Sequence, residues 1–352
     1  MKIRNLISFD DIDPGRWESL YTLCRDIMER PADYAGACRG KLLASLFFEA
    51  STRTRFSFQA AMLRLGGGVF GFSNPNDTSI AKGESLADTI RMTASYADTI
   101  VMRTPQEGAA RAAALYSEVP VINAGDGGHH HPTQTLADLT TIAMTRGKIG
   151  GVTVGLCGDL KYGRTVHPFV TALAMFPGIK ICLIAPDELK MPDYVMELMR
   201  ARGIPHTECA SLREAVGSLD ILYMTRIQRE RFPNGFPSES VDKILSRYTL
   251  TADDMRGAKR DLTVLHPLPR TGEVERAVDR DPRAKYFEQA KYGMYIRMAL
   301  LLKFTSLPRE MRRPEREGGS VCTNPVCVTS TEKYLPPLVT PDGNCGYCDR
   351  KL

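Results

Sequence analysis

The sequence lacks the features that mark membrane-embedded or exported proteins. It has no run of eighteen apolar residues, so we expect no membrane span and no membrane partner. Its start, MKIRNLISFDDID, has no apolar core of the signal-peptide kind, so we expect a cytoplasmic protein. The net charge of +5 is small for 352 residues and fits an anionic small substrate as well as a weak affinity for nucleic acid, so it decides little. We expect no nucleic-acid partner.

Several familiar motifs are also missing. There is no P-loop, and the glycines at 66–68 indicate only a turn. No Ser-His-Asp order, internal repeat or low-complexity tract stands out. Cysteine is sparse through the first 320 residues, where Cys24, Cys38, Cys157, Cys182 and Cys209 are scattered singly and are expected to be ordinary thiols.

What is present is a regular alternation of short apolar runs with helix-like segments. The chain is too long for one compact core, and 43% apolar with 25% charged residues is ordinary for a globular protein. Such alternation favours parallel sheets covered by helices on both faces. We therefore predict an α/β fold with two domains, each with a parallel sheet flanked by helices, and a small zinc-ribbon-like module at the C-terminus.

The predicted boundaries follow breaks in this pattern. The first domain covers 1–147 and is completed by a closing helix at 286–304; the second covers 148–285. A polar segment at 306–319, containing proline and glycine, indicates a linker, and 320–352 forms a cysteine-containing tail.

Candidate site residues follow the predicted strands, because ligands bind at the carboxyl ends of parallel strands. After the strand at 41–48 comes STRTR, where Ser51 is a good N-cap of a helix whose amides and dipole favour an anion. Thr52 and Thr54 add hydroxyl groups, and Arg53 adds a guanidinium. The simpler alternative is a capped helix with solvated arginines.

Two further loops of the first domain carry polar groups. Arg103 ends the strand at 99–103, and His131 directly precedes a helix-opening proline, where it could donate to a substrate oxygen or face water. Lys82 is the one lysine of a polar loop before a predicted helix, and from this pattern alone we would expect it to face solvent.

The second predicted sheet carries a different set of groups. Arg164, Arg226 and Gln228 follow its strands, and two guanidinium groups with an amide suit a dicarboxylate. The simpler alternative is surface arginines. A phosphate-type pocket in one domain and a carboxylate-type pocket in the other indicate group transfer from a phosphorylated donor to an acidic acceptor.

Six segments carry a family resemblance. FFEASTRTRFSF, VMRTPQEGAA, NAGDGGHHHPTQTLADL, GDLKYGRTVHP, ILYMTRIQRER and VLHPLPRTGEV, in this order, resemble the catalytic chain of aspartate carbamoyltransferase over about residues 1–308. This resemblance implies transfer of the carbamoyl group of carbamoyl phosphate to L-aspartate in pyrimidine synthesis, with no cofactor needed for catalysis.

The resemblance also implies roles for individual residues. The phosphate would be held by Ser51, Thr52, Arg53, Thr54 and Arg103, and the carbonyl oxygen by Thr54, Arg103 and His131, with Gln134 near the carbamoyl nitrogen. The aspartate side of the site would comprise Arg164, Thr165, Arg226, Gln228 and the carbonyl of Leu268. In a homotrimer, Ser79 and Lys82 would reach into the active site of the neighbouring subunit. This expectation replaces the solvent-facing interpretation of Lys82. The loop that carries Lys82 is one residue shorter than in the best-known members of the family.

Two alternatives remain open at this point. Ornithine carbamoyltransferases share the phosphate motif, but they read the amino acid with a cysteine in an HCLP segment, where this chain has HPLP at 266–269. A non-catalytic scaffold homologue is disfavoured because the catalytic motifs are intact.

The chain ends with two close cysteine pairs. Cys322 and Cys327 are separated from Cys345 and Cys348 by seventeen residues, which is zinc-ribbon spacing. Disulfides are the competing interpretation, which a reducing cytoplasm disfavours. We expect a structural zinc ion, because a segment this short cannot build a core by itself.

The tail also resembles the zinc domain of the family's separate regulatory chain, in which CxNxxC and CxYC hold the metal. Here it is fused to the catalytic chain without the nucleotide-binding domain that normally precedes it. We therefore expect the tail to pack on catalytic domains and take part in subunit assembly, including the assembly of trimers, and nucleotides to have little effect.

Overall fold

The computed structural model describes residues 4–227, 245–310 and 322–352. The chain divides into two compact units: unit 1 comprises Met1–Thr133 and Gly293–Leu352, and unit 2 comprises Gln134–Tyr292. Gln228 lies outside the described residues, as do most of the predicted linker and the first residues of the predicted tail. Among the described residues, no helix combines the length and apolar character that a membrane crossing requires.

Unit 1 is built on a four-stranded parallel sheet with the order β2-β1-β3-β4. The strands are β1 (Leu42–Phe47), β2 (Gly68–Phe72), β3 (Thr99–Thr104) and β4 (Val121–Asp126). Its helices are α1 (Pro14–Glu29), α2 (Arg53–Arg64), α3 (Leu86–Tyr96) and α4 (Ala109–Tyr116), and residues from Gly293 onward of α11 (Tyr286–Thr305) belong to the same unit. β3 and β4 are buried along their whole length, as expected for strands covered on both faces.

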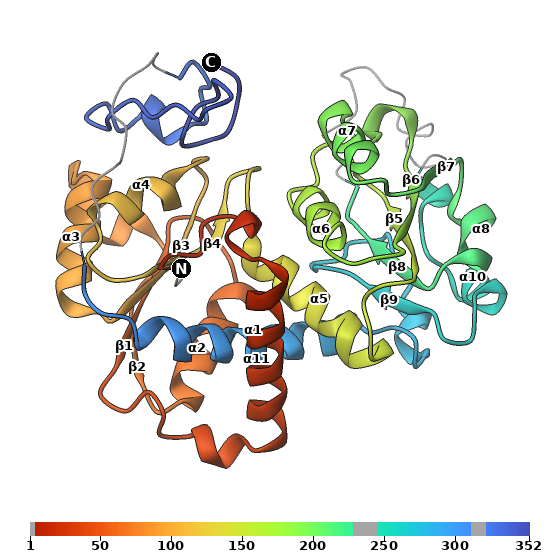
Figure 1. The fold of residues 1–352 in the computed structure, drawn as a ribbon, viewed down its shortest axis with the longest axis horizontal. Helices are drawn as coiled ribbons and strands as arrows, with labels where there is room; N and C mark the ends of the chain where they lie inside the picture. The colour runs from red at the N-terminus through yellow and green to blue at the C-terminus, as the bar shows by residue number, and fades with distance from the viewer. Residues whose placement is uncertain (1–3, 228–244, 311–321) are drawn as a thin grey trace. The chain divides into compact units, whose positions relative to one another are not determined.

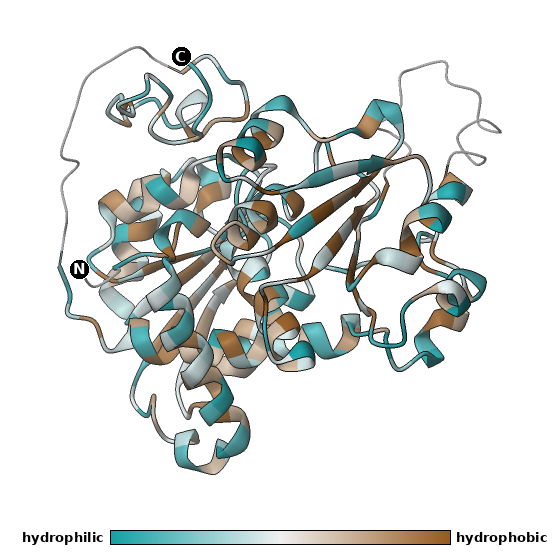
Figure 2. Ribbon diagram, turned by 45° about the vertical axis from the view of Figure 1, so that its right-hand side comes forward, coloured by the Kyte–Doolittle hydropathy of each residue, from teal (hydrophilic) through white to brown (hydrophobic). Residues whose placement is uncertain are grey.

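Unit 2 contains a five-stranded parallel sheet with the order β7-β6-β5-β8-β9. The strands are β5 (Thr153–Cys157), β6 (Lys180–Ile184), β7 (His206–Cys209), β8 (Ile221–Met224) and β9 (Thr263–Leu265). Its helices are α6 (Val166–Leu173), α7 (Asp193–Ala201), α8 (Leu212–Ala215) and α10 (Ala252–Gly257), and α5 (Pro132–Arg146) begins at the boundary of the two units. Figure 1 shows the helices flanking each sheet, and Figure 2 shows apolar strands inside each unit. The predicted fold class is therefore confirmed.

The C-terminal segment 322–352 packs on unit 1, where it lies over α4 (Figure 1). It has little regular structure apart from the short helix η9 (Val328–Ser330). Val328 and Tyr347 are buried in one hydrophobic cluster with Ile90 of α3 and Ala110 of α4. The segment thus shares the core of unit 1.

Backbone hydrogen bonds extend this contact. Glu107 N–H donates to Val326 O, and Val328 N–H donates to Glu107 O, both at 2.9 Å. The buried Glu107 carboxylate accepts from Asn324 Nδ2 at 2.8 Å and from Arg350 Nη2 at 3.2 Å. The loop between β3 and α4 therefore makes both backbone and side-chain hydrogen bonds to the tail.

Candidate active site

The predicted anion-binding residues of unit 1 lie at the carboxyl ends of neighbouring strands. α2 begins at Arg53, so Thr52 and not Ser51 is its N-cap; Thr52 has helical backbone angles and makes no capping side-chain bond, so our expectation for Ser51 was one residue off. Arg53 is exposed, whereas Thr54 is buried in the first turn. The first turn of α2 thus presents amides and hydroxyls beside β1.

Arg103 and His131 converge on one point. A Cβ built on Gly125, at the end of β4, would lie 3.2 Å from Arg103 Nη1 and 3.6 Å from His131 Cδ2. Gly125 has a φ of 122°, a conformation that favours glycine. The absence of a side chain at this position lets a guanidinium and an imidazole, both buried, come together at the end of the sheet.

Thr133 links His131 to α11. Arg297 Nη2 donates to Thr133 Oγ1 at 3.5 Å, and Thr133 Oγ1 lies 3.5 Å from His131 Nδ1. Because Nε2 is bonded to Cδ2, the Nε2 edge of the imidazole ring faces Gly125 and Arg103.

Our sequence analysis missed Glu49. Its Oε1 lies 2.6 Å from Arg103 Nη2, and both side chains are largely buried. The only signal was an acidic residue between the end of β1 and the STRTR segment. This ion pair holds the Arg103 guanidinium at the end of the sheet.

Ser79 and Lys82 bound the short helix η4 (Ser79–Lys82), where Lys82 is exposed. Thr78 caps this helix by accepting from Ile80 N–H at 3.3 Å. Gly83 ends it with a φ of 92°. Within one chain, Lys82 is thus placed at the exposed end of a well-defined turn.

In unit 2, the remaining predicted residues follow three adjacent strands. Arg164 and Thr165 come after β5, Arg226 after β8, and Leu268 after β9. A Cβ on Gly158 would lie 2.4 Å from Thr225 O, so the loop after β5 packs closely against the residue before Arg226. Arg226 is exposed, and Arg164 is half-buried.

The HPLP segment is held by a buried hydrogen-bond chain. Leu268 N–H donates to His266 Nδ1 at 2.8 Å, so Nε2 carries the proton and donates to Glu273 Oε1 at 2.7 Å. Burial alone would raise the pKa of Glu273, but hydrogen bonds from His266 and from backbone amides outweigh it and lower the pKa to about 2. The hydrogen bonds from Leu268 through His266 to Glu273 fix the backbone of the HPLP segment, and with it the position of the Leu268 carbonyl.

Gln134 is anchored by its amide group. Its Nε2 donates to Asp138 Oδ1 at 2.7 Å, and Asp138 also accepts from Tyr223 and Gln289. Because the amide nitrogen of Gln134 donates to Asp138, the side-chain carbonyl oxygen of Gln134 is the atom that can accept a further hydrogen bond.

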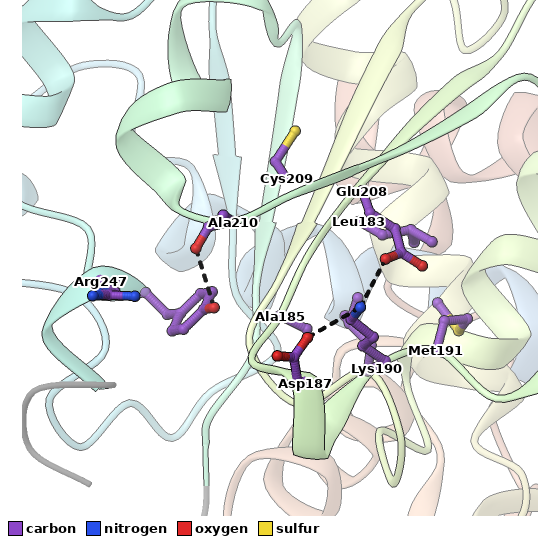
Figure 3. Close-up of a pocket in the computed structure, with 11 residues that line it drawn as sticks. Leu183, Ala185, Asp187, Lys190, Met191, Glu208, Cys209, Ala210 and Arg247 are labelled. Atoms are coloured by element: carbon purple, nitrogen blue, oxygen red, sulfur yellow. Dashed lines mark hydrogen bonds and ion pairs between the residues drawn. The ribbon is translucent and has the colours of Figure 1, made fainter. Parts of the chain in front are cut away.

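Unit 2 also contains a cavity of about 340 Å³ (Figure 3) that none of the predicted site residues lines. Lys190 on its wall is 3.0 Å from both Asp187 and Glu208. These ion pairs neutralise the charges that would bind a substrate there, so the cavity is a weaker candidate than the strand ends.

The four tail cysteines form one cluster. Their sulfur atoms all lie within 4.8 Å of one another, with Cys322–Cys348 at 3.6 Å and Cys327–Cys345 at 3.9 Å. These distances exclude disulfides, whose sulfur atoms are about 2.05 Å apart. They bracket the edge of about 3.8 Å expected of a sulfur tetrahedron around a metal at about 2.3 Å. The cluster therefore can hold a metal ion.

Polar groups also surround these sulfur atoms. Tyr347 N–H donates to Cys345 Sγ at 3.4 Å, and Asn324 Nδ2 donates to Cys348 Sγ at 3.5 Å. Donors of this kind stabilise metal-bound thiolates. Together with the sulfur distances, they make the residues present a good fit to a tetrahedral metal.

The fold and the polar side chains at the carboxyl ends of the strands are those of a two-domain transferase of the carbamoyltransferase class. Comparison with known proteins supports this classification. Models of the aspartate/ornithine carbamoyltransferase family match residues 4–144 (carbamoyl-P binding domain) and 150–304 (Asp/Orn binding domain). The aspartate carbamoyltransferase catalytic subunit of Clostridium botulinum is 52% identical over 304 residues, which cover 86% of this chain and 98% of that protein. This chain belongs to the family of aspartate carbamoyltransferase catalytic subunits.

Solved structures agree with this membership. The catalytic subunit of M. jannaschii aspartate transcarbamoylase has a TM-score of 0.81 and 44% identity, covering 86% of this chain and 97% of that one. Aspartate transcarbamoylase from Trypanosoma cruzi in complex with N-(phosphonacetyl)-L-aspartic acid has a TM-score of 0.80 and 39% identity, covering 86% and 96%.

Proposed function

We propose that this chain transfers the carbamoyl group of carbamoyl phosphate to the amino group of L-aspartate, giving N-carbamoyl-L-aspartate and phosphate for pyrimidine synthesis. The observation that carries the proposal is the convergence of Arg103 and His131 at Gly125. The ligand of the T. cruzi relative joins a phosphonate to aspartate in one molecule, which fits a donor and an acceptor of these two kinds.

In unit 1, the phosphate of the donor is held by amides, hydroxyls and guanidinium groups. The proposed ligands are Ser51, Thr52, Arg53, Thr54 and Arg103. A phosphate suits the start of α2, because the first amides of a helix have no partner within it and the helix dipole attracts negative charge.

The chemical step needs charge stabilisation and orientation. The aspartate amine attacks the carbamoyl carbon, and the carbonyl oxygen becomes an oxyanion that accepts from Thr54, Arg103 and His131, while Gln134 lies near the carbamoyl nitrogen. The C–O bond to phosphate then breaks, and the leaving phosphate takes the amine proton. Each positioned donor contributes about 3 kcal/mol to such a transition state, so no metal or covalent intermediate is required.

In unit 2, the acceptor groups suit an anionic amino acid. The proposed set is Arg164, Thr165, Arg226, Gln228 and the carbonyl of Leu268. The exposed guanidinium of Arg226 would pair with a carboxylate and repel the side-chain ammonium of ornithine. Pro267 also stands where ornithine-specific relatives have cysteine, so aspartate is the better acceptor.

Replacement of His131 tests the proposed chemistry. His131→Asn should lower kcat by roughly 100- to 1000-fold while phosphate affinity changes little, because the lost donor acts mainly on the developing oxyanion. His206→Asn is the matched control, since His206 lies in β7 with its Nδ1 3.1 Å from Ile204 O. An unchanged kcat in His131→Asn would refute the assigned role.

We also propose a homotrimer in which Ser79 and Lys82 complete the neighbouring site. Lys82→Ala and Arg53→Ala trimers should each be nearly inactive, and mixing them should restore activity at interfaces that hold both intact residues. The exposed position of Lys82 at the end of η4 supports this role. If mixed trimers recover nothing, Lys82 does not act across an interface.

The tail, we propose, binds one structural zinc ion through Cys322, Cys327, Cys345 and Cys348. Four thiolates fill a tetrahedral site and leave no position for a reacting water. In a reducing cytoplasm the thiols would remain available to the metal. Because the tail shares the core of unit 1, we further propose that it contributes to assembly of trimers.

A further inference from the structure

A second group of side chains that could hold a metal ion lies where the tail meets unit 1. His129 and His130 precede His131 in the loop between β4 and α5, and Asp349 directly follows Cys348. His129 Nε2 lies 3.0 Å and His130 Nε2 lies 3.2 Å from the same Asp349 Oδ2. The three side chains are partly shielded, with 12%, 19% and 38% of their areas exposed.

The spacing matches metal coordination. The three ligand atoms all lie within 4.8 Å of one another. Ligands at about 2.0–2.1 Å from a tetrahedral zinc ion are separated by about 3.3 Å, close to the two distances to Asp349. Two imidazoles and a carboxylate are also a ligand set that zinc-like ions accept.

A buried carboxylate on the far side of His129 provides an independent argument. His129 Nδ1 lies 3.1 Å from Asp126 Oδ2, and Asp126 is completely buried. Asp126 is itself fixed by Gly108 N–H at 2.9 Å, His130 N–H at 2.8 Å and Asn123 Nδ2 at 3.0 Å. Metal-ligating histidines typically donate their second nitrogen to such a carboxylate, which fixes the tautomer.

This tautomer requires a cation at the centre of the group. If Nδ1 donates to Asp126, the lone pair of His129 Nε2 is directed at an Asp349 oxygen 3.0 Å away. Two electron-pair donors at that distance repel each other unless a proton or a metal ion lies between them. A proton is thus the competing occupant of this position.

We propose that His129, His130 and Asp349 bind a second transition-metal ion of the zinc class, with Asp126 positioning His129. Three protein ligands leave a fourth position for water. The ion joins the tail directly to the loop that continues into His131, so its role is to fasten the tail on unit 1. This site is separate from the four cysteines and is independent of the reaction proposed above.

Cobalt titration of the untagged, full-length chain tests the proposal. Metal-free, reduced protein should bind two Co²⁺ per chain: one with the intense thiolate-to-metal charge-transfer band of a four-cysteine site, and one with only weak visible bands. His129→Gln, His130→Gln and Asp349→Asn should each weaken the second binding event by at least about 10-fold, since each removes or weakens a ligand. The thiolate band should persist and would report that the tail is still folded.

The matched control is His206→Gln, which removes an imidazole from β7 of unit 2 and should retain both binding events. The proposal is overturned if the wild-type chain binds a single Co²⁺ with thiolate bands. It is also overturned if the second event persists at unchanged affinity in all three ligand variants. In the first case the occupant is a proton, and the three side chains form only a hydrogen-bonded network.

Discussion

Replacing Gly108 by alanine should loosen the tail. Gly108 precedes α4 with a φ of 81°, and a Cβ there would lie 2.6 Å from the backbone carbon of Tyr347. The left-handed conformation costs a non-glycine residue about 1–2 kcal/mol. Forcing a methyl group into backbone contact costs a further 1–3 kcal/mol, roughly, because Tyr347 is buried and must shift.

Gly40→Ala separates these two costs. Gly40 lies in the same unit with a φ of 78°, and nothing lies within 4 Å of a Cβ built on it. It therefore carries the backbone strain without the clash. The two variants therefore differ in the free energy of docking the tail on unit 1 by the cost of the clash alone, about 1–3 kcal/mol. This corresponds to a roughly 5- to 140-fold change in the equilibrium constant for docking.

Hydrogen exchange measures this equilibrium. In Gly108→Ala, Glu107 N–H and Val328 N–H should exchange faster than in Gly40→Ala by that factor, because their hydrogen bonds join the tail to the loop before α4 and are lost when the tail undocks. Equal exchange in the two variants would refute the packing of Tyr347 on Gly108, and with it the account of how the tail is held.

Three further predictions concern the acceptor, the metal and the HPLP segment. Arg226→Ala should raise the KM for aspartate at least 10-fold and leave carbamoyl phosphate binding nearly unchanged, as steady-state kinetics would show; equal losses for both would contradict the assignment. Cys345→Ser should release the zinc ion and lower the native mass or melting temperature, while any surviving trimer keeps its chemistry; metal analysis that finds no zinc in wild-type protein would refute this. Glu273→Gln should lower the melting temperature most above about pH 5, and the difference should vanish as the pH falls through 2, because a carboxylate with a depressed pKa stabilises only while ionised; a pH-independent difference would exclude that origin.

Much of the fold could be predicted from the sequence because most strands are continuous apolar runs. KLLASLFF and VTVGLCG correspond to β1 and β5, which are buried almost throughout. β7, with the sequence HTEC, escaped prediction: it is an edge strand whose residues are exposed or half-buried, so no apolar run marks it. β2, the edge strand of the other sheet, is also only partly buried, but its apolar run VFGF made it predictable.

The candidate site was predictable only in part, for a related reason. Arg103 and His131 could be expected to lie close together, because parallel neighbours end at one edge of the sheet. The pairing of Glu49 with Arg103 depends on side-chain conformation, which periodicity does not encode. The contact between His129 and Asp349 joins residues 220 apart in the sequence and arises only when the tail docks.

Competition between two acceptors tests the central claim most directly. Purified chain would be given carbamoyl phosphate with equal concentrations of L-aspartate and L-ornithine, and both carbamoylated products and released phosphate would be quantified. We predict N-carbamoyl-L-aspartate in amounts equal to the phosphate released, with no carbamoylated ornithine above the uncatalysed background. Carbamoylated ornithine as the main product, or phosphate release without either product, would contradict the account.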